Sequence, residues 1–274
     1  MKKAVFGIIV TTRGFFNPEL ARRGRLRLLK KLHDKGYETV SLEPNGSETG
    51  LVETYADSIR CAELFRREKD RIDGIIVSIP NFGDETSTVE AVRLAELDVP
   101  VLVHAFDDRT DLLDLENRRD SFCGKISICA NLKQYGIHFT NTTLHTCDVE
   151  HPQFDEDLTH FNAVCQIYKG LKNMRVAQIG VRPAAFQTVR ASEKLLQKSG
   201  ITVVPVDTMQ IIHDAEALEM TPEVRQMLAE IRTYGSISAS VPEERLVKSA
   251  KLTVAIEQFM QANRCTCGAP YWDE

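Results

Sequence analysis

Short apolar runs alternate with amphipathic stretches along the first half of the chain. Four runs have the composition of strands, three of them near-continuous in apolar residues, and each is followed in the chain by a stretch with helical spacing of its apolar residues. Strands that are apolar along their whole length are buried on both faces, so this pattern predicts a parallel sheet covered by helices on both sides. We therefore expect a doubly wound α/β domain over residues 1–150. The four expected strands are residues 4–10, 37–43, 74–80 and 100–105.

A second α/β pattern follows over residues 151–264. It begins with an expected helix at about residues 155–171. Two later apolar runs, residues 174–180 and 201–207, predict parallel strands with helices between and after them. The fold class predicted for the whole chain is therefore α/β, with two Rossmann- or flavodoxin-like domains.

The last ten residues, 265–274, contain no apolar run that predicts a strand. Two strands make a poor sheet, because the mean sheet has about 5–6. We therefore expect the second domain to be incomplete at its C-terminal end and residues 265–274 to form a loosely packed tail. A missing strand would also leave part of the apolar face of the last helix exposed. The residues of that face are Leu252, Ile256 and Phe259.

Composition and charge exclude several classes of protein. The chain has 43% hydrophobic and 27% charged residues, as ordinary globular proteins do. A net charge of −5 argues against a nucleic-acid-binding protein. No apolar run approaches the ~20 residues that a membrane-spanning helix needs. The N-terminal apolar run is followed at once by Arg13, without the small-residue cleavage site of a signal peptide. We expect a cytoplasmic protein.

The seven cysteines are odd in number and scattered, which fits reduced thiols and not a disulfide framework. Cys265 and Cys267 lie one residue apart and offer a metal only two sulfurs, so a thiol–metal protein is a minor alternative. Three further cysteines and two histidines share one region but lack the close ligand pairs of a zinc site, which favours buried thiols. These five residues are Cys123, Cys129, Cys147, His138 and His145.

Candidate binding residues follow the ends of the expected strands, where open α/β sheets bind their ligands. Arg13 follows the first strand, and Asn81 and Phe82 follow the third. Arg182 and Phe186 follow the first strand of the second domain. Guanidinium and amide groups bind hydroxyls and aromatic rings cover apolar faces, so these residue types suit a small polyol. The alternatives are a solvated or ion-paired side chain for each arginine and a plug in the domain interface for Phe186.

Motifs for other chemistry are missing from the sequence. No GxGxxG follows an expected strand, and neither GxxxxGK[ST] nor GxSxG occurs, so nucleotide binding and serine hydrolysis lack their characteristic loops. Asp84 and Glu85 could act as a pair of bases, but acidic residues at the start of a helix mostly serve as caps.

Three long strings carry a resemblance to a known family. The strings "DGIIVSIPNFGDE", "NRRDSFCGKISICANLKQYGIHFTNTTLHT" and "IGVRPAAFQTVRASEKLL" resemble the N-terminal and middle domains of the L-fucose isomerase / L-arabinose isomerase family, especially its L-fucose isomerase-like members. The resemblance runs from about residue 4 to about residue 263. It implies a cytoplasmic aldose–ketose isomerase with three domains, two of them α/β, that assembles as an oligomer, commonly a hexamer.

The resemblance also implies roles for the candidate residues. In the family a neighbouring subunit's N-terminal domain covers the sugar pocket, so Arg13 and the Asn81-Phe82-Gly83 loop would reach the sugar from one subunit. Arg182 and Phe186 would line the same pocket from the middle domain. Family members bind Mn²⁺ through two acidic side chains and a histidine from the later part of the chain, and a carboxylate moves a proton between adjacent carbons.

This sequence departs from the family pattern before the stretch that carries those metal ligands. We therefore expect the N-terminal and middle domains of a sugar isomerase, inactive alone, with no catalytic residue, metal site or cofactor in this chain. The expected partners are a monosaccharide, either a pentose or a 6-deoxyhexose, and further copies of the chain. The alternative is a stand-alone sugar-binding or regulatory module, since two α/β lobes also make up periplasmic-type binding proteins.

Overall fold

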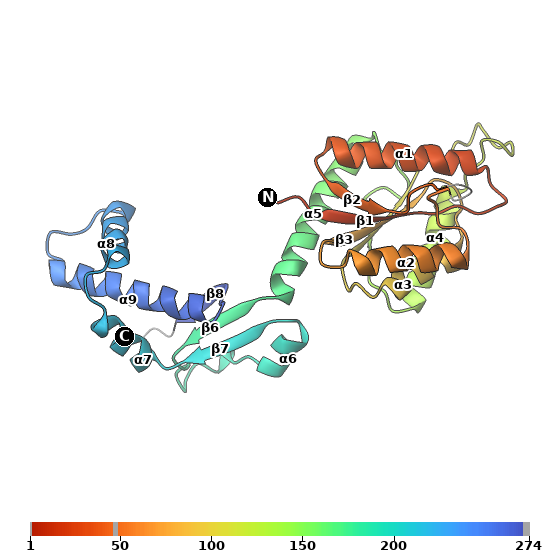
Figure 1. Cartoon of the computed structure of the whole chain (residues 1–274). Coiled ribbons are helices and arrows are strands. Elements are labelled where there is room, and N and C mark those ends of the chain that lie inside the picture. Colours follow the sequence, from red (N-terminus) through yellow and green to blue (C-terminus); the bar gives the residue numbers. More distant parts are fainter. Residues whose placement is uncertain (1, 46–48, 271–274) are drawn as a thin grey trace. The chain divides into compact units, whose positions relative to one another are not determined.

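The computed structural model describes residues 2–45 and 49–270. The chain forms two compact units, Met1–Lys169 and Gly170–Glu274 (Figure 1). Both are α/β units built on parallel sheets, as the sequence predicts. In the part of the chain that the structure describes, no helix is long and apolar enough to cross a membrane.

The sheet of the first unit contains the four predicted strands and one that the sequence did not reveal. The extra strand consists of only two residues, too short for a hydrophobic pattern to mark it. All neighbouring strands run parallel, in the order β2-β1-β3-β4-β5. The strands are β1 (Val5–Val10), β2 (Glu38–Ser41), β3 (Gly74–Ile79), β4 (Val101–Ala105) and β5 (Thr140–Asn141).

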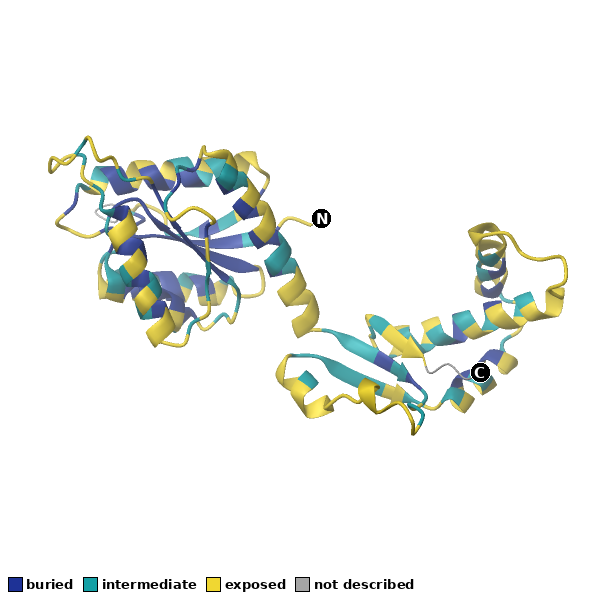
Figure 2. Ribbon diagram, turned by 180° about the vertical axis from the view of Figure 1, so that it is seen from behind, coloured by how far each residue is buried: buried dark blue, intermediate teal, exposed yellow. Residues whose placement is uncertain are grey.

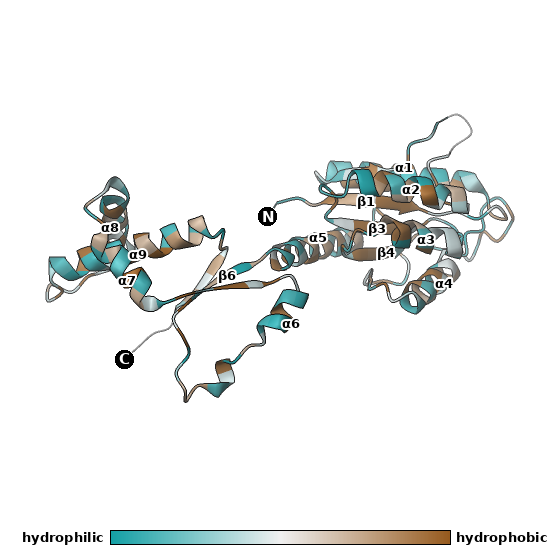
Figure 3. Cartoon of the chain, turned by 60° about the horizontal axis from the view of Figure 1, so that its bottom comes forward, coloured by the Kyte–Doolittle hydropathy of each residue, from teal (hydrophilic) through white to brown (hydrophobic). Residues whose placement is uncertain are grey.

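Helices cover both faces of this sheet, which explains why its central strands are apolar along their whole length. One apolar core contains residues of α2, α3 and α4, and the other contains residues of α1 and α5. Figure 2 shows the strands of this unit as its buried centre, and Figure 3 shows β1 and β3 as largely hydrophobic. The helices are α1 (Pro18–Asp34), α2 (Tyr55–Arg67), α3 (Glu85–Ala95), α4 (Ser121–Gln134) and α5 (Pro152–Lys172).

The helix α5 packs on the first sheet, so the first unit extends beyond the predicted boundary at residue 150. Phe161 and Cys165 of this helix are buried in the core that contains β1. Asn162 accepts a hydrogen bond from the backbone N–H of Ala4 at 2.8 Å. A Cβ atom on Gly74 would come within 2.5 Å of the Cys165 Sγ, so the glycine permits close contact between β3 and the helix.

The second unit has three parallel strands in the order β7-β6-β8, namely β6 (Arg175–Ile179), β7 (Thr202–Val206) and β8 (Cys267–Pro270). The expectation of an unpaired tail over residues 265–274 is therefore wrong for β8, which pairs with β6. The Thr266 backbone N–H also donates to the Arg175 carbonyl at 2.8 Å. These contacts use backbone groups and need no apolar side chains, so hydrophobicity did not reveal them. Residues 271–274 lie outside the described part.

The helices α7 and α9 pack against this second sheet. Ile256 and Phe259 of α9 pack against the cluster that contains Ile179 of β6. Leu252 of the same helix is 39% exposed, and Ile256 and Phe259 are partly buried. The expectation that part of this apolar face is exposed is therefore confirmed. The remaining elements are η1 (Gln187–Val189), α6 (Glu193–Lys198), α7 (Thr208–Ala217), α8 (Pro222–Tyr234) and α9 (Glu243–Ala262).

Candidate functional site

Two sets of predicted residues lie in different units, and the first set gathers where β1 and β3 end. Asn81 is fully buried and ties the two loops together. Its amide nitrogen donates to the Thr12 hydroxyl at 3.0 Å and to the Asn17 carbonyl at 3.4 Å. Among the described residues its amide oxygen has no hydrogen-bond partner. Asn81 is therefore placed to hold the loops, and its predicted contact with a sugar stays a prediction.

Aromatic rings and one arginine form the surface above these loops. The ring of Phe82 stacks on that of Phe16, with centroids 5.8 Å apart and planes 5° apart. The guanidinium of Arg13 lies over the Phe82 ring, 5.2 Å from its centroid. Phe15 packs edge-on against Phe16 and is 70% exposed. The structure thus brings Arg13 and Phe82 together. Of the three rings, that of Phe15 is the most exposed to solvent.

Neighbouring elements fix the loop that carries Phe82. The Asp84 carboxylate accepts a hydrogen bond from the Ser87 backbone N–H at 2.8 Å. Asp84 is therefore the cap of α3, as the capping alternative predicted. Arg119 donates to the Pro80 carbonyl at 2.7 Å. On the other side, Gly124 of α4 lies against the Phe82 backbone.

His104 is the next-to-last residue of β4 and is fully buried. Its Nε2 lies 2.8 Å from the Cys147 carbonyl oxygen, which can only accept, so Nε2 carries the hydrogen. Its Nδ1 then accepts from the Ser78 hydroxyl at 3.0 Å. Burial lowers the pKa of His104 to about 4. The imidazole is therefore neutral at physiological pH. Its two hydrogen bonds link β4 to Ser78 of β3 and to the backbone of Cys147. In the sequence, the sign of this buried histidine was a single polar residue inside an apolar run.

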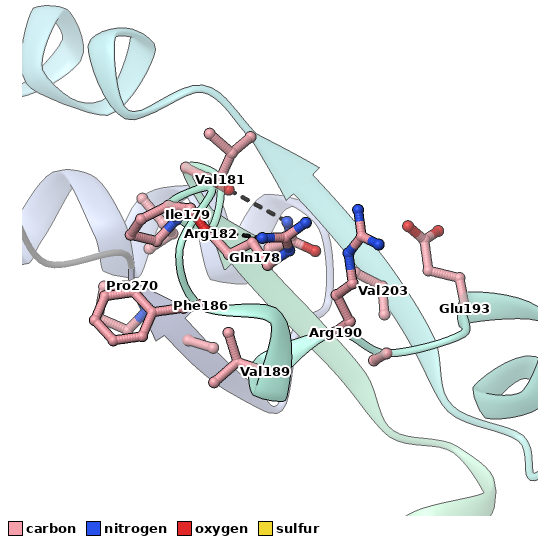
Figure 4. Close-up of a pocket in the computed structure, with 14 residues that line it drawn as sticks. Gln178, Ile179, Val181, Arg182, Phe186, Val189, Arg190, Glu193, Val203 and Pro270 are labelled. Atoms are coloured by element: carbon pink, nitrogen blue, oxygen red, sulfur yellow. Dashed lines mark hydrogen bonds between the residues drawn. The ribbon is translucent and has the colours of Figure 1, made fainter.

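The second set of predicted residues lines a cavity of about 960 Å³ in the second unit (Figure 4). Arg182 and Phe186 both belong to this lining, as expected from their place after a strand. The cavity lies where the loop after β6 folds back toward the sheet. Sequence reasoning did not single out four other lining residues of the sheet, the loop and α6, which are Gln178, Val189, Arg190 and Glu193.

Hydrogen bonds orient the polar groups of this cavity. One nitrogen of Arg182, Nη1, donates to the carbonyl of Pro183 at 2.8 Å and to that of Ala184 at 3.2 Å. The Gln178 amide nitrogen donates to the Gly180 carbonyl at 3.3 Å. Phe186 is 48% exposed, so its ring is open to a ligand. A polar residue within an apolar strand was the sequence signal that could have found Gln178.

The described residues offer no place for the Mn²⁺ that the resemblance implies. Among residues 2–45 and 49–270, no three side chains of His, Cys, Asp or Glu are grouped so that they could hold a metal ion. The cysteines are free thiols. Burial raises the pKa of Cys61 and of Cys165 to about 12 and that of Cys147 to about 11, so these three thiols stay protonated at neutral pH.

A sequence profile of the fucose/sulfoquinovose isomerase N-terminal domain matches residues 7–172. The chain belongs to this family. The predicted resemblance to the N-terminal region of the fucose isomerases is thus confirmed. The match covers the first sheet except for Val5 and Phe6 of β1, and it includes the loops that carry Arg13, Asn81 and Phe82 in this family member.

Other comparisons add little. None of the curated proteins matches this isomerase-family chain. One solved structure is a periplasmic solute binding protein of an ABC transporter from Actinobacillus succinogenes 130z with bound D-allose. It is 13% identical with a TM-score of 0.27, over 100% of this chain and 96% of that one. A glucose-galactose binding protein from Geobacillus stearothermophilus is 13% identical with a TM-score of 0.23, over 98% and 78%. Both TM-scores are too low to relate the whole folds.

Proposed function

We propose that this chain is the sugar-holding part of an aldose–ketose isomerase, made of its N-terminal and middle α/β domains. Membership of the fucose/sulfoquinovose isomerase family supports a monosaccharide as the ligand. The observation that supports the proposal most directly is the cavity of the second unit. It combines an accessible aromatic ring, Phe186, with the amide of Gln178 and the guanidinium of Arg182.

Each of these groups has a task that follows from its chemistry. The Phe186 ring packs on the C–H face of the sugar, which excludes water from one side of the ligand. Arg182 is held by two backbone carbonyls through Nη1, so its Nε and Nη2 hydrogens are oriented to donate to sugar oxygens. The Gln178 carbonyl oxygen accepts from a sugar hydroxyl. Together these contacts orient the sugar.

The first unit contributes the cover of the pocket in this proposal. The family resemblance implies that the first unit that covers a given pocket belongs to a neighbouring copy of the chain in a homo-oligomer. Arg13 and the Asn81-Phe82-Gly83 loop then face the sugar, and Phe15 supplies an exposed ring. The same proposal places the protein in the cytoplasm, which agrees with its free thiols.

The chemical step is not assigned to any described residue. Mn²⁺ binding needs a group of ligands that the described residues lack. The proposal therefore assigns metal binding and proton transfer to the part of the family's architecture that follows these two domains.

Calorimetric titration of monosaccharides into the purified chain tests the proposal. The sugars are L-fucose, L-arabinose, quinovose and sulfoquinovose. We expect at least one to bind, and Phe186→Ala to weaken its binding about tenfold or more, since losing a buried aromatic contact costs at least about 1.4 kcal/mol. Tyr234→Ala is the control, because Tyr234 is 97% exposed at the end of α8 and outside the cavity lining. Absence of binding by all four sugars, or equal binding by both variants, refutes the proposal.

A further inference from the structure

Residues 181–191 connect β6 to α6 and are fixed to the second unit at both ends. Before them, the Gly180 backbone N–H donates to the Val206 carbonyl of β7 at 2.8 Å. After them, the Ser192 side chain accepts from the Leu195 backbone N–H and caps α6. Between these two anchors, no hydrogen bond or ion pair in the described chain joins the segment to a residue outside it. Polar contacts therefore hold the 181–191 segment at its ends and not along its length.

The large apolar side chains of this segment are exposed. Val181 is 75% exposed, Val189 is 62% exposed and Phe186, as noted above, is about half exposed. None of the three belongs to an apolar core cluster of the described chain. All three line the cavity of the second unit. Apolar side chains that are exposed together around one cavity mark a surface that binding covers.

The segment forms one wall of the cavity, and the sheet forms most of the other. Half of the lining residues belong to the segment, and most of the rest belong to β6, β7 and β8 (Figure 4). The cavity volume of about 960 Å³ is near the upper end of the range of about 300–1,000 Å³ for ligand cavities. A monosaccharide is smaller than the drug-sized ligands that such cavities bind. A bound sugar therefore leaves room for the segment to move inward.

We infer that the 181–191 segment is a lid that closes on a sugar bound in this cavity. The inference rests on the proposed function and adds a conformational step to it. In closing, the segment turns about its fixed ends and brings Phe186 and Val189 onto the sugar. Gly180 is placed to act as one hinge, because its backbone lies at φ 80°, a region that glycine enters and leaves without steric cost. The lid belongs to the same chain as the cavity, so it acts in addition to the cover from a neighbouring copy.

The polar groups of the cavity explain why the lid closes only on a sugar. Without a sugar, a closed lid separates the Gln178 amide oxygen and the free donors of Arg182 from water, and burying a polar group without a partner is costly. Sugar hydroxyls replace that water as hydrogen-bond partners. Burial of Phe186 and Val189 then favours the closed state. The sugar thus binds the closed state more tightly than the open one, as a change driven by a ligand requires.

Limited proteolysis with elastase, which cleaves after small residues, measures the closing in solution. The bond between Ala184 and Ala185 lies in the exposed part of the segment, and neither residue lines the cavity. A bound sugar therefore cannot shield this bond by direct contact. The probe is the tightest binder among L-fucose, L-arabinose, quinovose and sulfoquinovose. At saturation it is expected to slow this cleavage about tenfold or more, because the open state that elastase cleaves falls to about a tenth of its population or less.

A second bond and a matched pair of variants are the controls. The bond between Ala239 and Ser240 lies in an exposed loop of the same unit, outside the cavity, and its cleavage should not change with sugar. Val189→Ser removes an apolar contact of the closed lid, so it should reduce the protection about threefold or more. Its melting temperature without sugar should equal that of the wild type, because Val189 is exposed in the open state. Val241→Ser, at another exposed position outside the cavity, should keep the full protection.

The outcomes separate the lid from the proposed function. If a sugar binds but cleavage after Ala184 is unchanged, or slows no more than cleavage after Ala239, the lid is overturned and the proposed function stands. Full protection in Val189→Ser, or an equal loss of protection in Val241→Ser, also overturns the lid. Failure of all four sugars to bind overturns both.

Discussion

Gly124 lies so close to Phe82 that a Cβ atom on the glycine would come within 1.8 Å of the Phe82 carbonyl oxygen. The glycine thereby lets the first turns of α4 press on the loop that presents Phe82 to Arg13. Gly124→Ala must push this backbone away, so we expect a loss of about 1–3 kcal/mol in the free energy of unfolding, as for other overpacked contacts. Urea denaturation measures this loss.

The control for this substitution is Gly170→Ala. Gly170 is also a helical glycine, but a Cβ atom there would meet nothing within 4 Å. It should leave the stability unchanged or raise it by up to about 1 kcal/mol, as Ala does in helices. If both variants are equally stable, the close contact with Phe82 has no energetic importance.

The buried His104 predicts that the first unit loses stability in acid. Burial lowers its pKa to about 4, against about 6.5 in an unfolded chain. Between these values the unfolded state binds a proton that the folded state does not, so the free energy of unfolding falls as the pH falls through this window. The loss is about 3 kcal/mol in total and does not grow below about pH 4, where both states are protonated.

Denaturation curves of the wild type and His104→Gln at a series of pH values check this expectation. The variant lacks the titrating ring, so its stability should fall less between about pH 6.5 and about pH 4. Parallel profiles for the two proteins would show that another group causes the acid sensitivity.

Pairing of β8 with β6 predicts that the end of the chain stabilises the second unit. A chain that ends at Arg264 loses this strand and leaves one edge of β6 unpaired. Loss of about four backbone hydrogen bonds should lower the stability by about 2–4 kcal/mol, seen as a lower melting temperature of this unit. The double variant Cys265→Ala, Cys267→Ala keeps the backbone and should melt near the wild type. If the double variant melted at a lower temperature than the truncated chain, the stabilisation would come from the thiols and not from strand pairing.

Sugar isomerisation by this chain alone is expected to be absent. The described residues contain no cluster of three His, Cys, Asp or Glu side chains that could hold the Mn²⁺ implied by the family resemblance. Without the metal ion the two sugar oxygens are not polarised. An assay of L-fucose and L-arabinose with added Mn²⁺ should detect no ketose. Turnover that survives chelation of contaminating metal, or that increases with Mn²⁺, contradicts this expectation.

The sequence predicted the central strands of both sheets because Val and Ile runs mark strands that are buried on both faces. It missed β5, which has two residues, and β8, which is built from Cys267, Gly268, Ala269 and Pro270. Both are held by backbone hydrogen bonds to a neighbouring strand. The pattern of hydrophobic residues does not predict such bonds.

The candidate site was predicted in part for a similar reason. Arg13, Phe82, Arg182 and Phe186 follow strands directly, and strand ends can be located from the sequence. Arg190 and Glu193 reach the cavity only because the loop after β6 folds back toward the sheet. That path depends on tertiary contacts, so residue order alone could not place these two side chains in the site.

The place of β8 beside β6 has a consequence for synthesis on the ribosome. The first strand of the second unit emerges early but binds a segment about ninety residues later in the chain, and pairing across such a distance is slow. During translation β6 keeps one edge open until residue 270 is made, and an open edge invites pairing with other nascent chains. The first unit needs no segment beyond α5, so it can fold while the ribosome is still synthesising the second unit. A pause or a chaperone late in translation would therefore protect the second unit and leave the first unaffected.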